Sequence, residues 1–242
     1  MGTDARKLIA DGYPLEQVVT SDLRQGGPFP PTWGHQQGPG VKTPLCLLCF
    51  CLLLLADFAN LGHKLFKTTQ ETYPIAFIPG DVFDPNHLEI ASPMAASAHW
   101  QASTGSESKA PDLRSLTSLN PLHGRVFAIH ASSIFHLFGE EKQLHLARAL
   151  AGLLSPEPGS TISGLHIGAP EKKGFERTIM HRDHHRMWCH SPESWTELWD
   201  GLVFEKGVVK VQTKLAHMER KILQPDAPQD AITFLVWSVT RL

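Results

Sequence analysis

Short apolar runs typical of strands alternate with helical patterns along most of the chain. The runs at 18–21, 75–78 and 125–131 are rich in β-branched and other apolar residues, whereas 140–154 carries apolar residues at helical spacing. Such alternation favours a mostly parallel sheet with helices on both faces. We therefore expect an α/β fold, closed by hairpin-like antiparallel strands at 208–215 and 232–241.

Acidic residues follow two of these expected strands directly. Asp22 ends the first run, and Gly80-Asp81 follows the second. Ligands of open α/β sheets bind at the carboxyl ends of the strands, where a carboxylate can accept hydrogen bonds from both hydroxyls of a ribose. Each acidic residue alone is equally consistent with an ordinary turn. Together they predict a nucleoside site, and Gly2-Thr3-Asp4 before a helical pattern is typical of the end of a glycine-rich ligand loop.

The bulk composition excludes several classes of protein. The chain has 22 Lys+Arg against 24 Asp+Glu, so no basic excess favours nucleic acid as a partner. The apolar run at 45–56 is shorter than the roughly 20 residues that a spanning helix needs, so we expect no membrane span. The N-terminus has no apolar core typical of a signal peptide, and four cysteines in 242 residues are no disulfide framework. We expect a cytoplasmic protein.

Two clusters of metal-ligating residue types occur in the chain. Cys46, Cys49 and Cys51 lack a second ligand pair at zinc spacing and are flanked by leucines. The His-rich stretch at 181–190 is a better candidate, but it has no regular ligand spacing, so solvated or substrate-facing histidines are the simpler interpretation. We therefore expect no metal site.

Several motifs occur in register with those of a known family. These motifs are, in order along the chain, GTDARKL (2–8), SDLR (21–24), LGHKLF (61–66), FIPGDVF (77–83) and IHASSIFHLF (129–138). Through them the chain resembles fungal class I S-adenosylmethionine-dependent methyltransferases related to the enzymes of meroterpenoid biosynthesis. The resemblance covers about 1–25 and 58–242. The resemblance implies a Rossmann-like sheet and S-adenosyl-L-methionine as cofactor.

The resemblance also implies where that cofactor would bind. Gly2 and Asp4 match the end of the cofactor loop, and Asp22 and Leu23 match the ribose-binding strand tip. The adenine-side tip corresponds to Gly80, Asp81 and Val82, and the tip that faces the methyl-donor end of the cofactor corresponds to Ala131, Ser132 and Ser133.

The chain departs from the family pattern in two places. A strand ending in a glycine motif should precede Gly2, so the family's first, central strand is expected to be missing and the single domain, 1–242, to be truncated. About 33 residues, 26–58, separate two motifs that should be nearly adjacent. We interpret this segment as a poorly ordered insert or translated intron; a hydrophobic lid is the alternative.

Methyl transfer needs alignment of donor and acceptor more than acid–base chemistry. The resemblance implies a small-molecule substrate, a secondary metabolite methylated on a carboxyl or hydroxyl oxygen. His130 and His136 flank a strand tip, so either could orient a substrate or act as a base, and packing roles are equally consistent. The alternatives are a catalytically impaired fragment, a nicotinamide-dependent oxidoreductase and a metal-dependent hydrolase built on 181–190.

Overall fold

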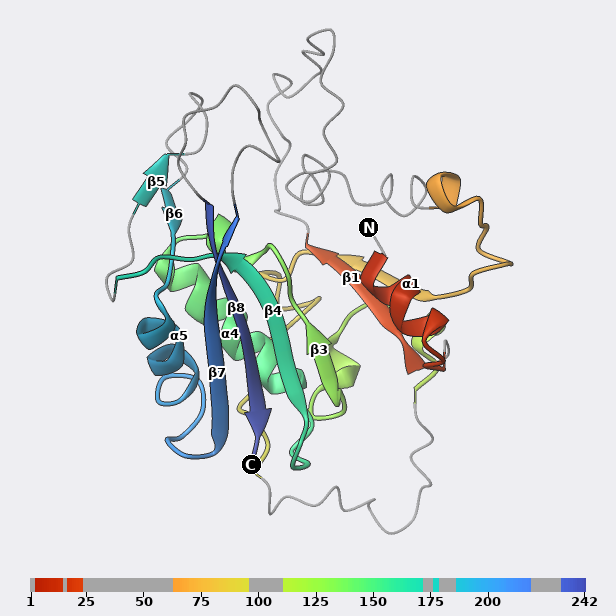
Figure 1. The fold of residues 1–242 in the computed structure, drawn as a ribbon. Helices are drawn as coiled ribbons and strands as arrows, with labels where there is room; N and C mark the ends of the chain where they lie inside the picture. The colour runs from red at the N-terminus through yellow and green to blue at the C-terminus, as the bar shows by residue number, and fades with distance from the viewer. Residues whose placement is uncertain are drawn as a thin grey trace, which may run out of the picture. The chain divides into compact units, whose positions relative to one another are not determined.

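The computed structural model describes residues 3–14, 17–23, 63–95, 111–171, 176–178, 186–218 and 232–242. The chain divides into two compact units. Unit 1 comprises Met1–Glu89 with Ser108–Pro121, and unit 2 comprises Ile90–Glu107 with Leu122–Leu242. The elements are coloured along the chain in Figure 1.

Unit 1 contains a two-stranded parallel sheet. Helix α1 (Thr3–Ala10) precedes strand β1 (Val19–Leu23), which pairs in parallel with β2 (Ala76–Gly80). Gly12 follows α1 with a φ of 99°, a conformation that glycine adopts without strain and that is common just after a helix end. The small core of this unit is aliphatic: Val18, Ile75, Ala76, Ile78, Val82, Leu88 and Leu119.

Unit 2 contains a mixed sheet of four strands in the order β3-β4-β8-β7. Strand β3 (Ala128–His130) runs parallel to β4 (Thr161–Ile167), whereas β8 (Ile232–Arg241) is antiparallel to both β4 and β7 (Val209–Met218). The predicted C-terminal antiparallel pair is confirmed. One edge of this sheet is β7, which exposes Lys210 and Lys214, and the other is the three-residue β3.

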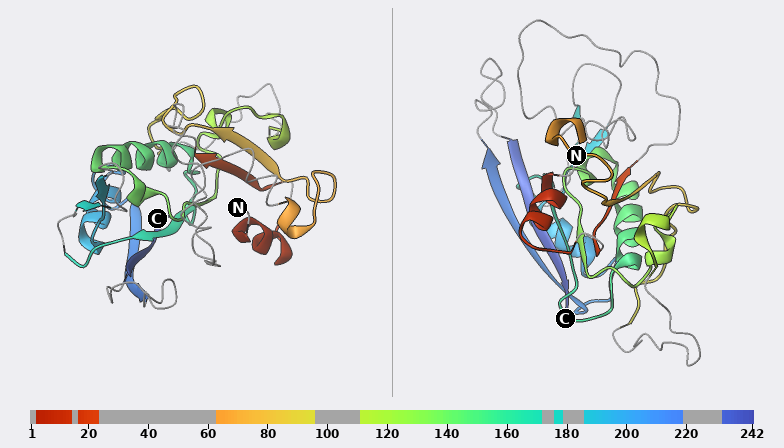
Figure 2. Two further views of the ribbon diagram at one scale, coloured as in Figure 1. Left: turned by 90° about the horizontal axis from the view of Figure 1, so that it is seen from above. Right: turned by 90° about the vertical axis from the view of Figure 1, so that its right-hand side faces the viewer.

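Two helices accompany this sheet. Helix α4 (Glu140–Leu153) begins with Glu140 and Glu141, whose charges favour a helix N-terminus. Helix α5 (Pro192–Trp199) begins at Ser191, whose side chain accepts a hydrogen bond from the Ser194 amide in a capping box. Helix α4 agrees with the helix predicted at 140–154. Figure 2 shows α4 and the strands of this unit as separate layers.

Within unit 2 the described helices cover one face of the sheet. The side chains of Ile162, His166, Leu235 and Trp237 on that face are buried, whereas Leu165 and Val236, which pair across β4 and β8 on the opposite face, are exposed. We predicted helices on both faces of the sheet. Among the described residues of this unit, helices cover one face of it. The sheet is mixed rather than mostly parallel.

The remaining described elements are short. An antiparallel pair, which the sequence did not predict, joins β5 (Glu176–Thr178) to β6 (Arg186–Trp188). The 3-10 helices are η3 (Leu113–Ser115), η4 (Asn120–Leu122) and η5 (Phe135–Leu137). The predicted insert, 26–58, lies outside the described residues. In the part of the chain that is described, no helix is both long and apolar enough to cross a membrane.

Candidate functional site

The two acidic strand ends predicted to hold a nucleoside are neighbours in unit 1. In the parallel register of β1 and β2, Asp22 pairs with Pro79 and Leu23 pairs with Gly80. Because parallel strands end at the same edge and lie about 4.8 Å apart, the backbones of the ribose-side and adenine-side tips are adjacent. For Asp22 and Leu23 the structure describes the backbone.

The residues after Gly80 form a turn that Asp81 itself stabilises. Asp81 Oδ1 accepts a hydrogen bond from the Phe83 amide at 2.9 Å, and the Asp84 amide donates to the Asp81 carbonyl at 3.0 Å. Asp81 is partly exposed, so its carboxylate can contact a ligand as well as its own turn. Val82 is 1% exposed and packs in the core of unit 1, which leaves its backbone for any ligand contact.

A buried histidine that the sequence analysis missed packs against the β2 tip. A Cβ atom built on Gly80 would collide with the imidazole of His87, so the glycine is required by this side chain. His87 is 5% exposed, and its Nε2 lies 3.4 Å from Ser21 Oγ. Burial lowers the pKa of His87 below its usual value, against the opposing charges of Asp84 and Asp81. His87 therefore supports the β2 tip as a neutral ring.

The other predicted part of the cofactor site lies at the start of the chain. Asp4 is in the first turn of α1, where the structure describes its backbone, and Gly2 lies outside the described residues.

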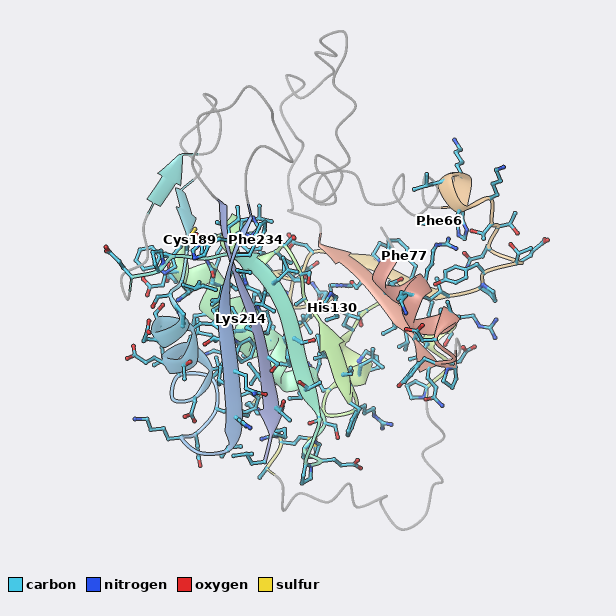
Figure 3. The ribbon with its side chains drawn as sticks, in the orientation of Figure 1. Phe66, Phe77, His130, Cys189, Lys214 and Phe234 are labelled. Carbon is cyan, nitrogen blue, oxygen red and sulfur yellow. The ribbon has the colours of Figure 1, made fainter. Side chains whose placement is uncertain are left out.

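The third predicted tip, at the end of β3, belongs to unit 2 and is built around a histidine and a serine. His130 is exposed (Figure 3). Its Nε2 lies 2.9 Å from Ser132 Oγ. The Leu165 amide donates to Ser132 Oγ at 3.3 Å, and the Ala131 amide donates to the Ser163 carbonyl at 2.8 Å. The predicted residues His130, Ala131 and Ser132 therefore form one connected tip.

Two backbone features hold this β3 tip close to β4. A side chain at Gly164 would collide with the carbonyl of Ala131, so only glycine permits this approach. Ser133 has a φ of 58°, in the left-handed region that non-glycine residues rarely adopt, and its amide donates to the Leu165 carbonyl at 2.6 Å. Such strain persists where the surroundings fix the backbone, and it concentrates at functional sites.

His136, the second histidine of the predicted pair, is in the interior of unit 2. It is 2% exposed, and neither ring nitrogen has a hydrogen-bond partner among the described residues. Burial lowers its pKa to about 4, so it is neutral near pH 7. Its ring stacks at 6.4 Å on that of His166, which accepts a hydrogen bond from Trp237 Nε1 at 2.9 Å. Of the two predicted histidines, His130 is thus the one that solvent and a substrate can reach.

The metal candidates receive no support from the described residues. Among these, no three His, Cys, Asp or Glu side chains are close enough together to hold a metal ion. Cys189 and His190 are buried, and His190 Nδ1 lies 3.0 Å from Ser194 Oγ. The triplet of cysteines at 46–51 and the histidines at 181–185 lie outside the described part of the chain.

Comparison with known proteins gives a consistent set of relatives. Over 207 residues, 86% of this chain, it is 25% identical to "O-methyltransferase phiE" of Fungal sp. (strain ATCC 74256), covering 48% of that protein. Over the same length it is 23% identical to "Methyltransferase ausD" and to "Methyltransferase prhM", both of Penicillium brasilianum, covering 52% of each. The chain therefore spans about half the length of the curated relatives it matches.

Other comparisons add little. No protein-family model matches the chain. A solved structure described as a DhpI-SAH complex aligns with a TM-score of 0.27 at 14% identity, over 48% of this chain and 47% of that chain, a likeness too low to support an argument about fold. The sequence relatives bear out the family resemblance that the motifs predicted: over most of its length, this chain is similar to fungal methyltransferases.

Proposed function

We propose that the chain is part of an S-adenosylmethionine-dependent methyltransferase that methylates a carboxyl or hydroxyl oxygen of a small secondary metabolite. The similarity to fungal methyltransferases over 86% of the chain carries this proposal. One of these relatives is named as an O-methyltransferase, which favours oxygen as the methylated atom.

The described residues of unit 1 are compatible with the adenosine part of this cofactor. The parallel register of β1 and β2 brings two acidic tips together, and Asp81 is partly exposed. Asp22 would accept from the ribose hydroxyls, and Asp81 would accept from the adenine amino group. A charged hydrogen bond of this kind contributes roughly 1.5–3 kcal/mol.

When bound, S-adenosylmethionine supplies an activated methyl group on a sulfonium. The protein has then to hold an acceptor oxygen in line with that group, and alignment can lower the barrier by roughly 7–11 kcal/mol. The polar groups predicted for this task are those of His130 and Ser132. His136, the other predicted histidine, is buried and would act by packing inside unit 2 rather than by contact with substrate.

Calorimetric titration of S-adenosylmethionine into the chain tests this proposal. Asp22→Ala and Asp81→Asn should each weaken binding roughly 10- to 150-fold, because each removes one charged acceptor. Asn at 81 keeps an oxygen for the Phe83 amide, so the turn remains. Asp112→Ala, which removes an exposed carboxylate at η3 in the same unit, is the matched control and should bind like the unaltered chain.

Two results would count against the proposal. A folded, unaltered chain that binds no S-adenosylmethionine would favour an impaired fragment. Binding that survives both tip substitutions would mean that the cofactor is held elsewhere.

A further inference from the structure

One buried histidine of unit 1 contacts both strand ends that are proposed to hold the cofactor. The ring of His87 packs over Gly80, the last residue of β2, where it occupies the space of a side chain. Its Nε2 lies 3.4 Å from Ser21 Oγ on β1. Ser21 directly precedes Asp22, and Gly80 directly precedes Asp81. His87 therefore contacts the residue before each of the two carboxylates.

The Ser21 hydroxyl extends this contact to the backbone of β2. Its Oγ donates a hydrogen bond to the Ile78 carbonyl at 2.7 Å, and the two residues are partners in the register of the strands. Side chains of a strand alternate between faces, so Ser21, Ile78 and the next residue but one, Gly80, share one face of the sheet. His87 packs on that face. The ring, the hydroxyl and both strands thus form one connected group.

The backbone of His87 is itself held on both sides. Its amide donates to the Asp84 carbonyl at 2.9 Å, and its carbonyl accepts from the Leu119 amide at 2.8 Å. The Asp84 amide in turn donates to the Asp81 carbonyl, so consecutive turns lead the chain from the β2 tip back to His87. A ring on an anchored backbone can restrain the strand ends that it contacts.

The ends of this sheet are where such a restraint matters. Leu23 and Gly80 are the last pair of the register, and the described sheet of unit 1 has these two strands. An isolated pair of strands is marginally stable in water. A ligand that spans both tips binds more tightly when their separation is fixed beforehand, because binding then orders fewer groups.

We propose that His87 is a positioning residue for the cofactor, and that it holds the ribose-side tip of β1 next to the adenine-side tip of β2 through Ser21 and Gly80. This inference rests on the proposed function and deepens it, since it makes adenosine recognition depend on a residue outside the predicted cofactor contacts. In this role His87 affects a ligand that spans both tips and not one that contacts a single tip.

Two ligands separate positioning from general stability. S-adenosylhomocysteine carries the whole adenosine group, whereas adenine alone would contact the β2 tip. Ser21→Ala removes the hydroxyl beside His87. It should weaken S-adenosylhomocysteine binding about three- to tenfold, as expected for the loss of one hydrogen bond, and leave adenine binding within about twofold. Calorimetry measures the first ligand, and saturation-transfer NMR measures the second.

Thr20→Val is the matched control. Thr20 Oγ1 also joins a hydroxyl of β1 to a carbonyl of β2, since it donates to Ala76 at 3.1 Å, but Thr20 belongs to the opposite face of the strand from Ser21. This variant should bind both ligands like the unaltered chain. His87→Leu should behave like Ser21→Ala. The double variant should lose no more than the larger single loss, because both changes remove the same contact.

Nitrogen NMR of histidine-labelled protein reports the contact without a ligand. Ser21→Ala should shift the ring signals of His87, and Thr20→Val should leave them unchanged.

Three results would overturn the inference: equal effects of Ser21→Ala and Thr20→Val on S-adenosylhomocysteine binding, equal weakening of adenine and S-adenosylhomocysteine by Ser21→Ala, or additive losses in the double variant. Failure of the proposed function gives a different result. A folded, unaltered chain that binds no S-adenosylhomocysteine would contradict that function and this inference with it. A chain that binds the ligand through Asp22 and Asp81 but is insensitive to Ser21→Ala would contradict only the role of His87.

Discussion

The two units differ in the size of their sheets and in the side chains that form their cores. Unit 1 has a two-stranded sheet and an aliphatic core, and its residues Leu65 and Phe66 are exposed. Unit 2 has a four-stranded sheet around buried aromatic rings, where Trp195 lies 4.9 Å from both Phe135 and Trp237. An isolated pair of strands is marginally stable in water, whereas three or more strands packed on helices form a stable layer. The proposed adenosine-binding tips thus belong to the unit with less built-in stability.

The largest expected effect comes from the aromatic core. Trp195→Ala should destabilise unit 2 by about 3–5 kcal/mol, because it removes a fully buried side chain and leaves a cavity. Hydrogen exchange read by mass spectrometry should show the loss in β4, β7 and β8. The matched change in unit 1, Ile78→Ala, should deprotect β1 and β2 instead. If either variant loosened both units equally, the division between them would not hold.

Acid should affect unit 2 more than unit 1. His136, His166 and His190 are buried there, and burial lowers the pKa of His136 and of His190 to about 4 and that of His166 well below its usual value. In the unfolded chain these histidines take up protons near pH 6.5, whereas in the folded chain they do so only at much lower pH. Their contribution to the free energy of unfolding is therefore fully present above pH 6.5 and falls as the pH drops toward 4. The loss approaches about 3 kcal/mol for His136 alone.

Urea unfolding at pH 7.5, 6 and 5 measures this dependence. His136→Phe should flatten the slope by up to one proton. Unit 1 has a single buried histidine among its described residues, His87, whose pKa Asp84 and Asp81 partly restore. A steeper acid response in β1–β2 than in the four-stranded sheet would reverse the comparison.

Each unit has a glycine at which a neighbouring group leaves no room for a side chain, and the kind of neighbour differs between the two. Gly80→Ala in unit 1 collides with the His87 ring, whereas Gly164→Ala in unit 2 collides with the Ala131 backbone. Both should cost about 1–3 kcal/mol. Adding His87→Ala should rescue the first, because it vacates the space, and no side-chain deletion should rescue the second. Thermal unfolding of the single and double variants checks this, and equal rescue of both would be evidence against a backbone-limited β3 tip.

The smallest effects come from two residues with left-handed backbone. Ser133 in unit 2 and Lys67 in unit 1 have φ values of 58° and 51°. Replacing either with glycine should relieve strain and stabilise its unit by up to about 1 kcal/mol. If the β3 tip is strained for function, Ser133→Gly should also shift the NMR signals of His130, and Lys67→Gly should leave them unchanged. Identical spectra for the two variants would assign the strain at Ser133 to folding alone.

Elements with strong local signals could be predicted from the sequence. Apolar residues at helical spacing located α4, and apolar runs near the C-terminus located β7 and β8. The acidic tips were also predictable, since Asp22 lies near the end of β1 and Asp81 directly follows β2. The prediction of a single domain that needs an additional central strand stays a prediction.

Interactions between distant residues could not be predicted. His87 contacts Gly80 through a turn that has no recognisable spacing, and Ser132 contacts His130 because Gly164, more than thirty positions later, lets β3 approach β4. For His136 the sequence left a base, a substrate-orienting residue and a packing role open. In the structure His136 is buried, as are its neighbours Phe135 and Phe138.

The two outer strands of the four-stranded sheet have a consequence for how the protein behaves at high concentration. An unpaired strand edge is a template on which another chain can add by backbone hydrogen bonding, and long, flat, apolar edges are the most prone to it. Strand β7 carries two exposed lysines along its length, and β3 is only three residues long. Repulsion between lysines disfavours pairing at the β7 edge, and the short length of β3 disfavours it at the other edge. Edge-to-edge aggregation is therefore disfavoured at both sides of this sheet.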